Sequence, residues 1–283
     1  MRGAGKENLV GWLMRAATYF IVFVIASIIF TIIYNGIPAI SWNFLSTMPR
    51  NSGAEGGILP AIIGTLLLVA GTIIVALPLG MATAIYLSEY AKLGRLTRTI
   101  RLAIVTLAGV PSIVFGLFGL GLFVIFLRFG ASIISGCLTL ACMILPTIIV
   151  ASEESLRAVP KSLREGSLAL GATKWQTIRK NVLPYSVSGM LTGSILGIGR
   201  AAGETAPILL TVAAFYLPKL PRSIFDQVMA LPYHLYVLAT QHPDIVKVRP
   251  MQYGTALILI VLVLGVNLAA ILSRIHIRRK YKW

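Results

Sequence analysis

Long uncharged apolar segments are the feature that most constrains how this chain of 283 residues can fold. Several of them reach the ~20 residues that a helix needs to cross the hydrocarbon core of a bilayer. Hydrophobic residues make up 57% of the chain, more than a soluble globular protein carries. We therefore expect an all-α polytopic membrane protein with six transmembrane helices. The six expected spans are residues 16–34, 59–87, 102–127, 132–151, 185–216 and 251–273.

The basic residues are unevenly distributed between the two sides of this six-span arrangement. The net charge is +16, and 18 of the 25 lysines and arginines fall in the first tail, in the segment 88–101, in the segment 152–184 or in the last tail. All four lie on one side, and the positive-inside rule makes that side the cytoplasm. Both termini are then cytoplasmic. Membrane topology explains the charge, so we expect no nucleic-acid partner.

The segment 152–184 is a charged island between two apolar spans, and its residues predict two short helices joined by a glycine turn. Ser162 and Glu165 have the spacing of a capping box, as do Thr173 and Gln176. Gly171 suits the left-handed residue that closes a first helix, and Pro184 is expected to stop the second. Two helices this short are marginal alone, so the loop needs a partner surface.

The spacing of this segment resembles the EAA loop in the permease subunits of ATP-binding-cassette importers. The pattern is Glu-Ala-Ala, three residues, Gly, nine residues, Ile, one residue and Leu-Pro, with Gly166 and Ser167 here in place of the alanines and Asn181 in place of the isoleucine. The resemblance implies that the loop docks onto an ATPase subunit. The docking residues would be Glu165, Gly166, Ser167, Gly171, Leu183 and Pro184. The alternative is an ordinary pair of amphipathic helices.

Two charges interrupt the expected fifth span. Arg200 and Glu204 are four residues apart and would share one helix face. A charge at mid-bilayer costs about 2.5–3.5 kcal/mol, so the two must pair, face water or meet a substrate. This arrangement suits an anion path. A guanidinium matches a tetrahedral oxyanion, and nearby glycines leave backbone amides exposed as further donors. The alternative is an ion pair that only locks helix packing.

The expected third span contains a second unusual stretch, AGVPSIVFGLFGLG at residues 108–121. Pro111 has no amide hydrogen, so one helical carbonyl loses its hydrogen-bond partner, and three glycines leave the helix without side chains at their positions. Broken backbone at membrane depth is tolerated where it faces protein or a water-filled path. Close packing of an intact helix through small residues explains the glycines equally well.

Three stretches together resemble the permeases of phosphate-specific importers, and the PstA type more than its PstC sister. They are PSIVFGL at 111–117, EESLRAVPKSLREGSLALGATKW at 153–175 and GRAAGETAPILLT at 199–211. The resemblance covers roughly residues 60–273 and implies the type I importer permease fold, called MetI-like. It puts the substrate path at Arg200 and Glu204, and the same motifs add Gly203, Thr205 and Ser112.

The resemblance also implies partners and a location. They are a PstC-like sister permease, two PstB-like ATPase subunits, a PstS-like phosphate-binding protein and inorganic phosphate, in the lipid of a bacterial inner membrane. ATP and magnesium would be used by the ATPase, with no cofactor on this chain. The expected divisions are a cytoplasmic tail at 1–15, a first span with its outside loop at 16–58, a transmembrane domain at 59–273 and a basic tail at 274–283.

The residues argue against catalysis by this chain. No phosphate-binding G-x-x-x-x-G-K-[ST] loop occurs, because Gly5 and Lys6 are followed by Glu7. No metal-spaced cluster occurs, and His234 and His242 are expected to be isolated surface residues. Three alternatives remain. They are a permease for sulfate or molybdate, a secondary transporter acting alone, which should show inverted repeats, and a membrane enzyme using Arg200 and Glu204 as acid and base.

Overall fold

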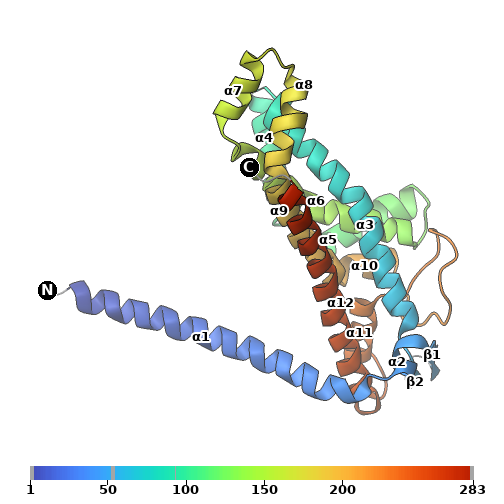
Figure 1. Cartoon of the computed structure of the whole chain (residues 1–283). Coiled ribbons are helices and arrows are strands. Elements are labelled where there is room, and N and C mark those ends of the chain that lie inside the picture. Colours follow the sequence, from blue (N-terminus) through green and yellow to red (C-terminus); the bar gives the residue numbers. More distant parts are fainter. Residues whose placement is uncertain (1–2, 52–54, 93, 281–283) are drawn as a thin grey trace.

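The computed structural model describes residues 3–51, 55–92 and 94–280, and most of these form long helices that run side by side (Figure 1). Within these ranges five helices are long and apolar enough to cross a membrane, and a bent pair adds a sixth. This confirms the expectation of an all-α membrane protein with six spans.

Helix α1 (Gly3–Gly36) leaves the body of the molecule as a separate arm (Figure 1). Its apolar span, Val10–Ala39, is longer than the expected 16–34, and none of its most apolar window is buried. The contact with the body is at its C-terminal end. There Gly36 lies against Leu257 and the Tyr253 carbonyl of α12 (Ile245–Lys280).

The connection after α1 is compact. It contains the short 3₁₀ helix η1 (Ile37–Ala39), α2 (Trp42–Ser46) and a two-stranded antiparallel pair, β1 (Pro49–Arg50) with β2 (Glu55–Gly56). The Ser41 hydroxyl caps α2 by accepting from the Phe44 amide at 3.1 Å. Phe44 is buried with Ile58 and Met229, so this connection is packed onto the helices.

Helix α6 (Ile133–Arg157) is the centre of the bundle. It packs between α3 (Leu59–Ile85) and α9 (Leu183–Gly203), and 67% of its apolar window is buried. Ile144 and Ile148 have no exposed surface. Free Cys137 is buried and Cys142 is partly buried, as expected of unpaired thiols in a core helix.

The third span is bent. It consists of α4 (Arg95–Leu107), then α5 (Ser112–Gly119) and the π-helical η4 (Leu120–Phe126), which turn by 106°. Of the two alternatives for residues 108–121, broken backbone is the one found, and α4 begins at Arg95, inside the basic segment 88–101 and before the expected start of the span at 102. Pro111 explains the bend, because proline has no amide for the helix and disfavours helical backbone at the residue before it.

The fifth span begins earlier and ends earlier than expected. Helix α8 (Lys174–Thr177), the π-helical η5 (Ile178–Val182) and α9 form one continuous span, Lys174–Gly203. Pro184 therefore does not stop a helix, since it lies in the first turn of α9, where a missing amide is tolerated. The span does not reach residue 216, because Glu204 is extended and α10 (Ala206–Thr211) starts anew with Pro207 in its first turn.

The outer connection between the last two spans contains α11 (Leu231–Thr240), close to the expected helix at 231–239. It is no simple surface helix, because Leu231 and Leu238 are fully buried. Helix α12 begins at Ile245, so Pro250 lies inside it and not before it as expected.

We predict that Gly64→Ala in α3 destabilises the fold by about 1–3 kcal/mol, the usual cost of overpacking a core. A β-carbon at Gly64 would collide with the Met229 carbonyl, whereas one at Gly265 in α12 meets nothing within 4 Å. Heating the detergent-purified chain and measuring the fraction that stays monodisperse checks this. Gly265→Ala is the control, and equal midpoints for the two variants would contradict the packing argument.

Candidate transport and docking sites

Arg200 and Glu204 form an ion pair where the fifth span breaks. The Arg200 Nε atom lies 3.0 Å from the Glu204 Oε1 atom. The pairing was expected, but a shared helix face was not found, because Glu204 follows α9 with φ −75° and ψ 133°. The Arg200 side chain is 42% exposed and that of Glu204 16%, so the pair lies at the surface of this chain and not in its core.

Close packing brings the two broken spans together at this place. A β-carbon on Gly116 of α5 would lie 3.0 Å from the Ala206 carbonyl and 3.1 Å from the Pro207 Cα atom. Glycine at 116 therefore allows α5 to approach the start of α10. The bend of the third span and the break of the fifth are neighbours in space.

Four of the five expected path residues lie together in the structure, and the fifth does not. Arg200, Gly203, Glu204 and Thr205 belong to one turn, where Gly203 is exposed and Thr205 is half-buried. Ser112 is separate, since it opens α5 one turn before Gly116. Among the described residues, no hydrogen bond joins Ser112 to the Arg200 turn.

The Arg200 guanidinium keeps donors free for another group. Its Nε–H is used by Glu204, whereas the two terminal nitrogens have no hydrogen-bond partner within the described chain. A guanidinium presents its N–H groups in a fork that binds two oxygens of an oxyanion at once. The turn can therefore hold an anion while Glu204 fixes the arginine.

The EAA-like loop, residues 152–184, contains α7 (Lys161–Ala169), a glycine turn and α8. Gly171 has φ +82°, which confirms the left-handed turn. The Gly171 amide donates to the Leu168 carbonyl and the Ala172 amide to the Ser167 carbonyl, the paired bonds of a Schellman motif.

One of the two expected capping boxes in this loop is present. The Thr173 hydroxyl accepts from the Gln176 amide, and the Gln176 side chain accepts from the Thr173 amide. The box expected from Ser162 and Glu165 is absent, because Pro160 is the residue before α7 and Ser162 already lies inside the helix. Residues 152–157 belong to the end of α6.

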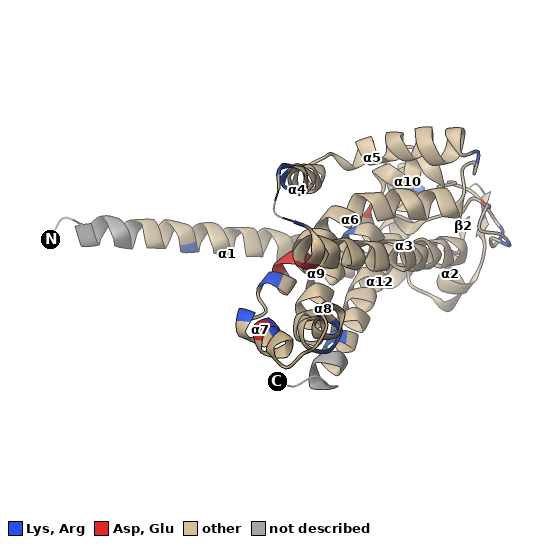
Figure 2. Cartoon of the chain, turned by 90° about the horizontal axis from the view of Figure 1, so that it is seen from above, with Lys and Arg blue, Asp and Glu red and all other residues tan. Residues whose placement is uncertain are grey.

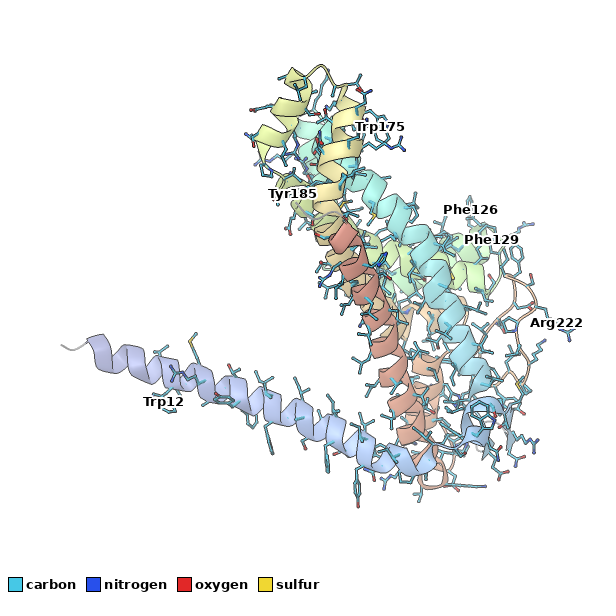
Figure 3. The ribbon with its side chains drawn as sticks, viewed as in Figure 1. Trp12, Phe126, Phe129, Trp175, Tyr185 and Arg222 are labelled. Carbon is cyan, nitrogen blue, oxygen red and sulfur yellow. The ribbon has the colours of Figure 1, made fainter. Side chains whose placement is uncertain are left out.

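The tip of the EAA-like loop exposes large apolar side chains. Leu170 is 90% exposed, and Trp175, whose side chain points away from the bundle in Figure 3, is 53% exposed. Glu165 and Gly166 are exposed beside them, while Leu183 and Pro184 are half-buried at the start of α9. Ser167 faces inward, with its hydroxyl 3.0 Å from that of Thr177. Apolar surface at a charged tip is typical of a protein interface.

Sequence reasoning missed a set of ion pairs at the end of the bundle near this loop. Glu89 pairs with Arg164 at 2.9 Å, and Glu153 pairs with both Arg101 and Arg157 at 2.8 Å. In Figure 2, charged residues lie on α7 and at the start of α4. Only the i,i+4 spacing of Glu153 and Arg157 could have been found in the sequence. The other partners are far apart along the chain.

The histidine at 234 is not the surface residue that we expected. Its side chain is 1% exposed, and its ring stacks on Phe215 with centroids 5.9 Å apart. Burial lowers the pKa of His234 from 6.5 to about 4. In the described part of the chain, no three His, Cys, Asp or Glu side chains gather in a way that could hold a metal ion.

Comparison with known proteins places these features in a family. The model of the family described as "Binding-protein-dependent transport system inner membrane component" matches residues 76–282. The chain belongs to this family. An inner membrane component of this kind accounts for the six-span fold, and the matched region contains the bent span, the EAA-like loop and the Arg200 turn.

Two relatives show which members resemble this inner membrane component. The "Phosphate transport system permease protein PstA 1" of Mycobacterium tuberculosis (strain CDC 1551 / Oshkosh) is 40% identical, covering 80% of this chain and 73% of that protein. The "Probable ABC transporter permease protein YqgI" of Bacillus subtilis (strain 168) is 34% identical, covering 84% and 85%. These matches confirm the expected resemblance to PstA-type permeases.

Solved structures support the MetI-like fold. The bacterial alginate ABC transporter in complex with a pentasaccharide-bound periplasmic protein matches with a TM-score of 0.64 at 14% identity, over 96% of this chain and 94% of that one. The inward-facing MetNI methionine ABC transporter matches with a TM-score of 0.59 at 17% identity, over 78% and 94%.

We predict that His234 makes the fold sensitive to acid. Its pKa is lower in the folded state, so below pH 6.5 the unfolded chain binds a proton that the folded chain does not. Stability should fall between pH 6.5 and pH 4 by about 3 kcal/mol and change no further below that through this group. Thermal unfolding across this range measures it.

His234→Phe keeps the ring stack and should remove most of that pH dependence. His276→Phe, at an exposed histidine of α12, serves as the control and should leave the dependence unchanged. The assignment to His234 fails if its variant retains the full acid sensitivity.

Proposed function

We propose that this chain is the transmembrane permease subunit of an ATP-driven importer of inorganic phosphate. The PstA relatives support the substrate, because they align with 80% of the chain at 40% identity. The observation that carries the proposal is the Arg200 guanidinium, which is half-exposed at the break of a span and keeps its terminal nitrogens free.

The chemistry of the turn suits an anion that must bind and then leave. The free N–H groups of Arg200 would bind two phosphate oxygens in a bidentate manner. Glu204 holds the guanidinium through Nε and reduces its net attraction, so the ion is not trapped. Gly203 leaves the backbone beside the pair exposed, which gives the ion room.

Energy has to come from other subunits, because this chain carries no nucleotide-binding loop. We assign ATP hydrolysis with magnesium to two PstB-like ATPase subunits. One of them would dock on the apolar tip of the EAA-like loop around Leu170 and Trp175, next to Glu165, Gly166 and Gly171. No cofactor is assigned to the chain itself.

The unburied helix faces fit the remaining partners. Helix α1 exposes its whole apolar window, and only 11% of the window of α12 is buried. We assign these faces to lipid and to a PstC-like sister permease that forms the other half of the path. A PstS-like binding protein would deliver phosphate on the outer side. The assembly would lie in a bacterial inner membrane, with this chain as a multi-pass subunit.

We predict that Arg200→Gln lowers phosphate uptake by about a hundredfold or more, the order of effect when a charged anchor is lost. Because the pair is partly exposed, chain abundance and complex assembly should stay normal. Arg200→Lys should recover uptake only in part, since an ammonium lacks the bidentate fork. Uptake of radiolabelled phosphate into vesicles measures the effect.

The double variant Arg200→Gln with Glu204→Gln separates binding from packing. If the arginine serves the ion, this variant assembles and still does not transport. Recovered uptake in it would show that the pair serves packing alone. Arg222→Gln, at an exposed arginine of the outer connection, is the matched control and should transport normally.

We predict that Gly171→Pro detaches or uncouples the ATPase and lowers uptake by about tenfold or more. Proline cannot adopt φ +82°, and it removes the amide that donates to the Leu168 carbonyl. Co-purification of the ATPase subunit, together with uptake, checks this. Gly130→Pro imposes the same conflict at φ +67° in the outer turn before α6 and should leave the ATPase bound. Normal coupling in Gly171→Pro would contradict docking through this loop.

A further inference from the structure

Arg164 ties the EAA-like loop to the body of the bundle. From α7 its Nη1 atom donates to the Val159 carbonyl at 2.6 Å, and its Nη2 atom donates to the Leu156 carbonyl at 2.7 Å and to Glu89 at 2.9 Å. The Leu156 carbonyl belongs to the last turn of α6, and Val159 lies just after that helix. Arg164 is 21% exposed and Glu89 9%, so this contact is shielded from water.

Glu89 lies in η3 (Tyr86–Tyr90), the π-helical end of α3. The Ser88 hydroxyl donates to the same carboxylate oxygen at 3.3 Å. A second contact comes from α8, whose Lys174 ammonium lies 5.0 Å from the centroid of the Tyr90 ring, a cation–π distance. Side chains from both helices of the EAA-like loop, α7 and α8, therefore contact the same five-residue π-helical segment, η3.

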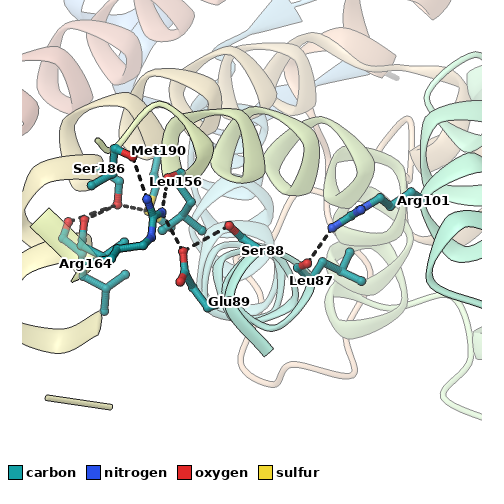
Figure 4. A network of polar contacts seen from close by, with 11 residues as sticks. Leu87, Ser88, Glu89, Arg101, Leu156, Arg164, Ser186 and Met190 are labelled. Atoms are coloured by element: carbon teal, nitrogen blue, oxygen red, sulfur yellow. Dashed lines mark hydrogen bonds and ion pairs between the residues drawn. The ribbon is translucent and has the colours of Figure 1, made fainter. Parts of the chain in front are cut away.

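The other side of η3 is held by the bent third span. Arg101 of α4 donates from Nη2 to the Leu87 carbonyl at 2.6 Å, and its Nε atom lies 2.8 Å from Glu153 of α6. Figure 4 shows Arg164 and Arg101 approaching the end of α3 from opposite sides. Helix α4 leads into α5, which packs on α10 beside the Arg200 turn.

We infer that the Glu89–Arg164 ion pair is a positioning contact that transmits movement of the EAA-like loop to the transport path through η3 and Arg101. The inference rests on the proposed function, in which this loop seats the ATPase. A π-helical turn is a local irregularity frequently found at functional sites, and here it joins the loop to α4. Neither residue would touch phosphate or ATP.

Glu89→Gln tests the pair without breaking the fold. Glutamine has the shape of glutamate, and Arg164 keeps its two carbonyl acceptors, Leu156 at the end of α6 and Val159 just after it. The loss is the charge that couples α7 to α3. Arg164→Gln removes two backbone hydrogen bonds as well as the ion pair, so its effect alone cannot be assigned to the pair. It therefore serves as the second single variant of a double-mutant cycle.

The experiment uses the complex of full-length chain, sister permease and ATPase in proteoliposomes. A reporter cysteine replaces Val114, which is 45% exposed on α5, and an impermeant maleimide measures its labelling rate with and without magnesium ATP. The parent chain without the reporter gives the background of Cys137 and Cys142. ATP hydrolysis, subunit composition and phosphate uptake are measured on the same samples.

In the wild type we expect ATP to change the labelling rate. In Glu89→Gln we expect this change, and the phosphate imported per ATP hydrolysed, to fall about tenfold, within the usual range for coupling between sites. Hydrolysis and subunit composition should not change. The double variant should be no worse than Arg164→Gln alone. Glu55→Gln breaks an exposed pair with Lys247, 3.4 Å apart on the outer side, and should keep full coupling.

Three results would overturn the inference: unchanged coupling in Glu89→Gln, additive losses in the double variant, or loss of the ATPase from the Glu89→Gln complex, since the pair would then serve assembly. The wild-type complex tests the proposed function separately. ATP-linked labelling without phosphate uptake rejects phosphate as the cargo and leaves the transmission intact. No ATP-linked labelling in a wild-type complex that retains the ATPase and hydrolyses ATP rejects the transmission, whereas absence of the ATPase from the wild-type complex rejects the docking.

Discussion

In lipid every backbone amide and carbonyl must find a partner inside the protein, and the rest of this structure depends on that requirement. It makes the chain helical almost throughout and makes each interruption costly. The two interruptions between helices of the bundle, at residues 108–111 and at Glu204–Thr205, are placed next to one another through the contact of Gly116 with Ala206. The two breaks are thus neighbours, and together they leave a polar turn beside the only arginine of α9.

The arginines at the loop end of the bundle bind backbone carbonyls at the ends of helices. Arg164 donates to the Leu156 carbonyl in the last turn of α6 and to the Val159 carbonyl just after that helix. Arg101 does the same for Leu87 at the end of α3. These two arginines therefore do more than set the membrane topology, because they also join the ends of separate helices. The EAA-like loop is consequently fixed to the bundle at its base, while its apolar tip is exposed.

Burial is uneven in a way that fits one subunit of a larger assembly. The apolar window of α6 is 67% buried, whereas that of α1 is not buried at all. A single core therefore holds α3, α6 and α9 together, while the outer spans present surface for lipid and for other subunits. Leu170, at the loop tip, lies outside the spans and is 90% exposed, and under the proposed function this surface binds the ATPase subunit.

The sequence by itself determined the fold class, most spans, the left-handed Gly171 and the pairing of Arg200 with Glu204. These follow from local chemistry: apolar length, glycine backbone freedom and the cost of a lone charge in lipid. Motif spacing also identified the family, because the EAA-like loop and the 199–211 stretch are continuous in the chain. Only the tertiary structure decided the 106° bend, the end of α9 at Gly203, the burial of His234 and the Glu89–Arg164 pair. The bend takes place at the break that Pro111 allows, and the other three depend on which distant segment fills the neighbouring space: α10 against α5, Phe215 against His234, and a partner 75 residues away for Glu89.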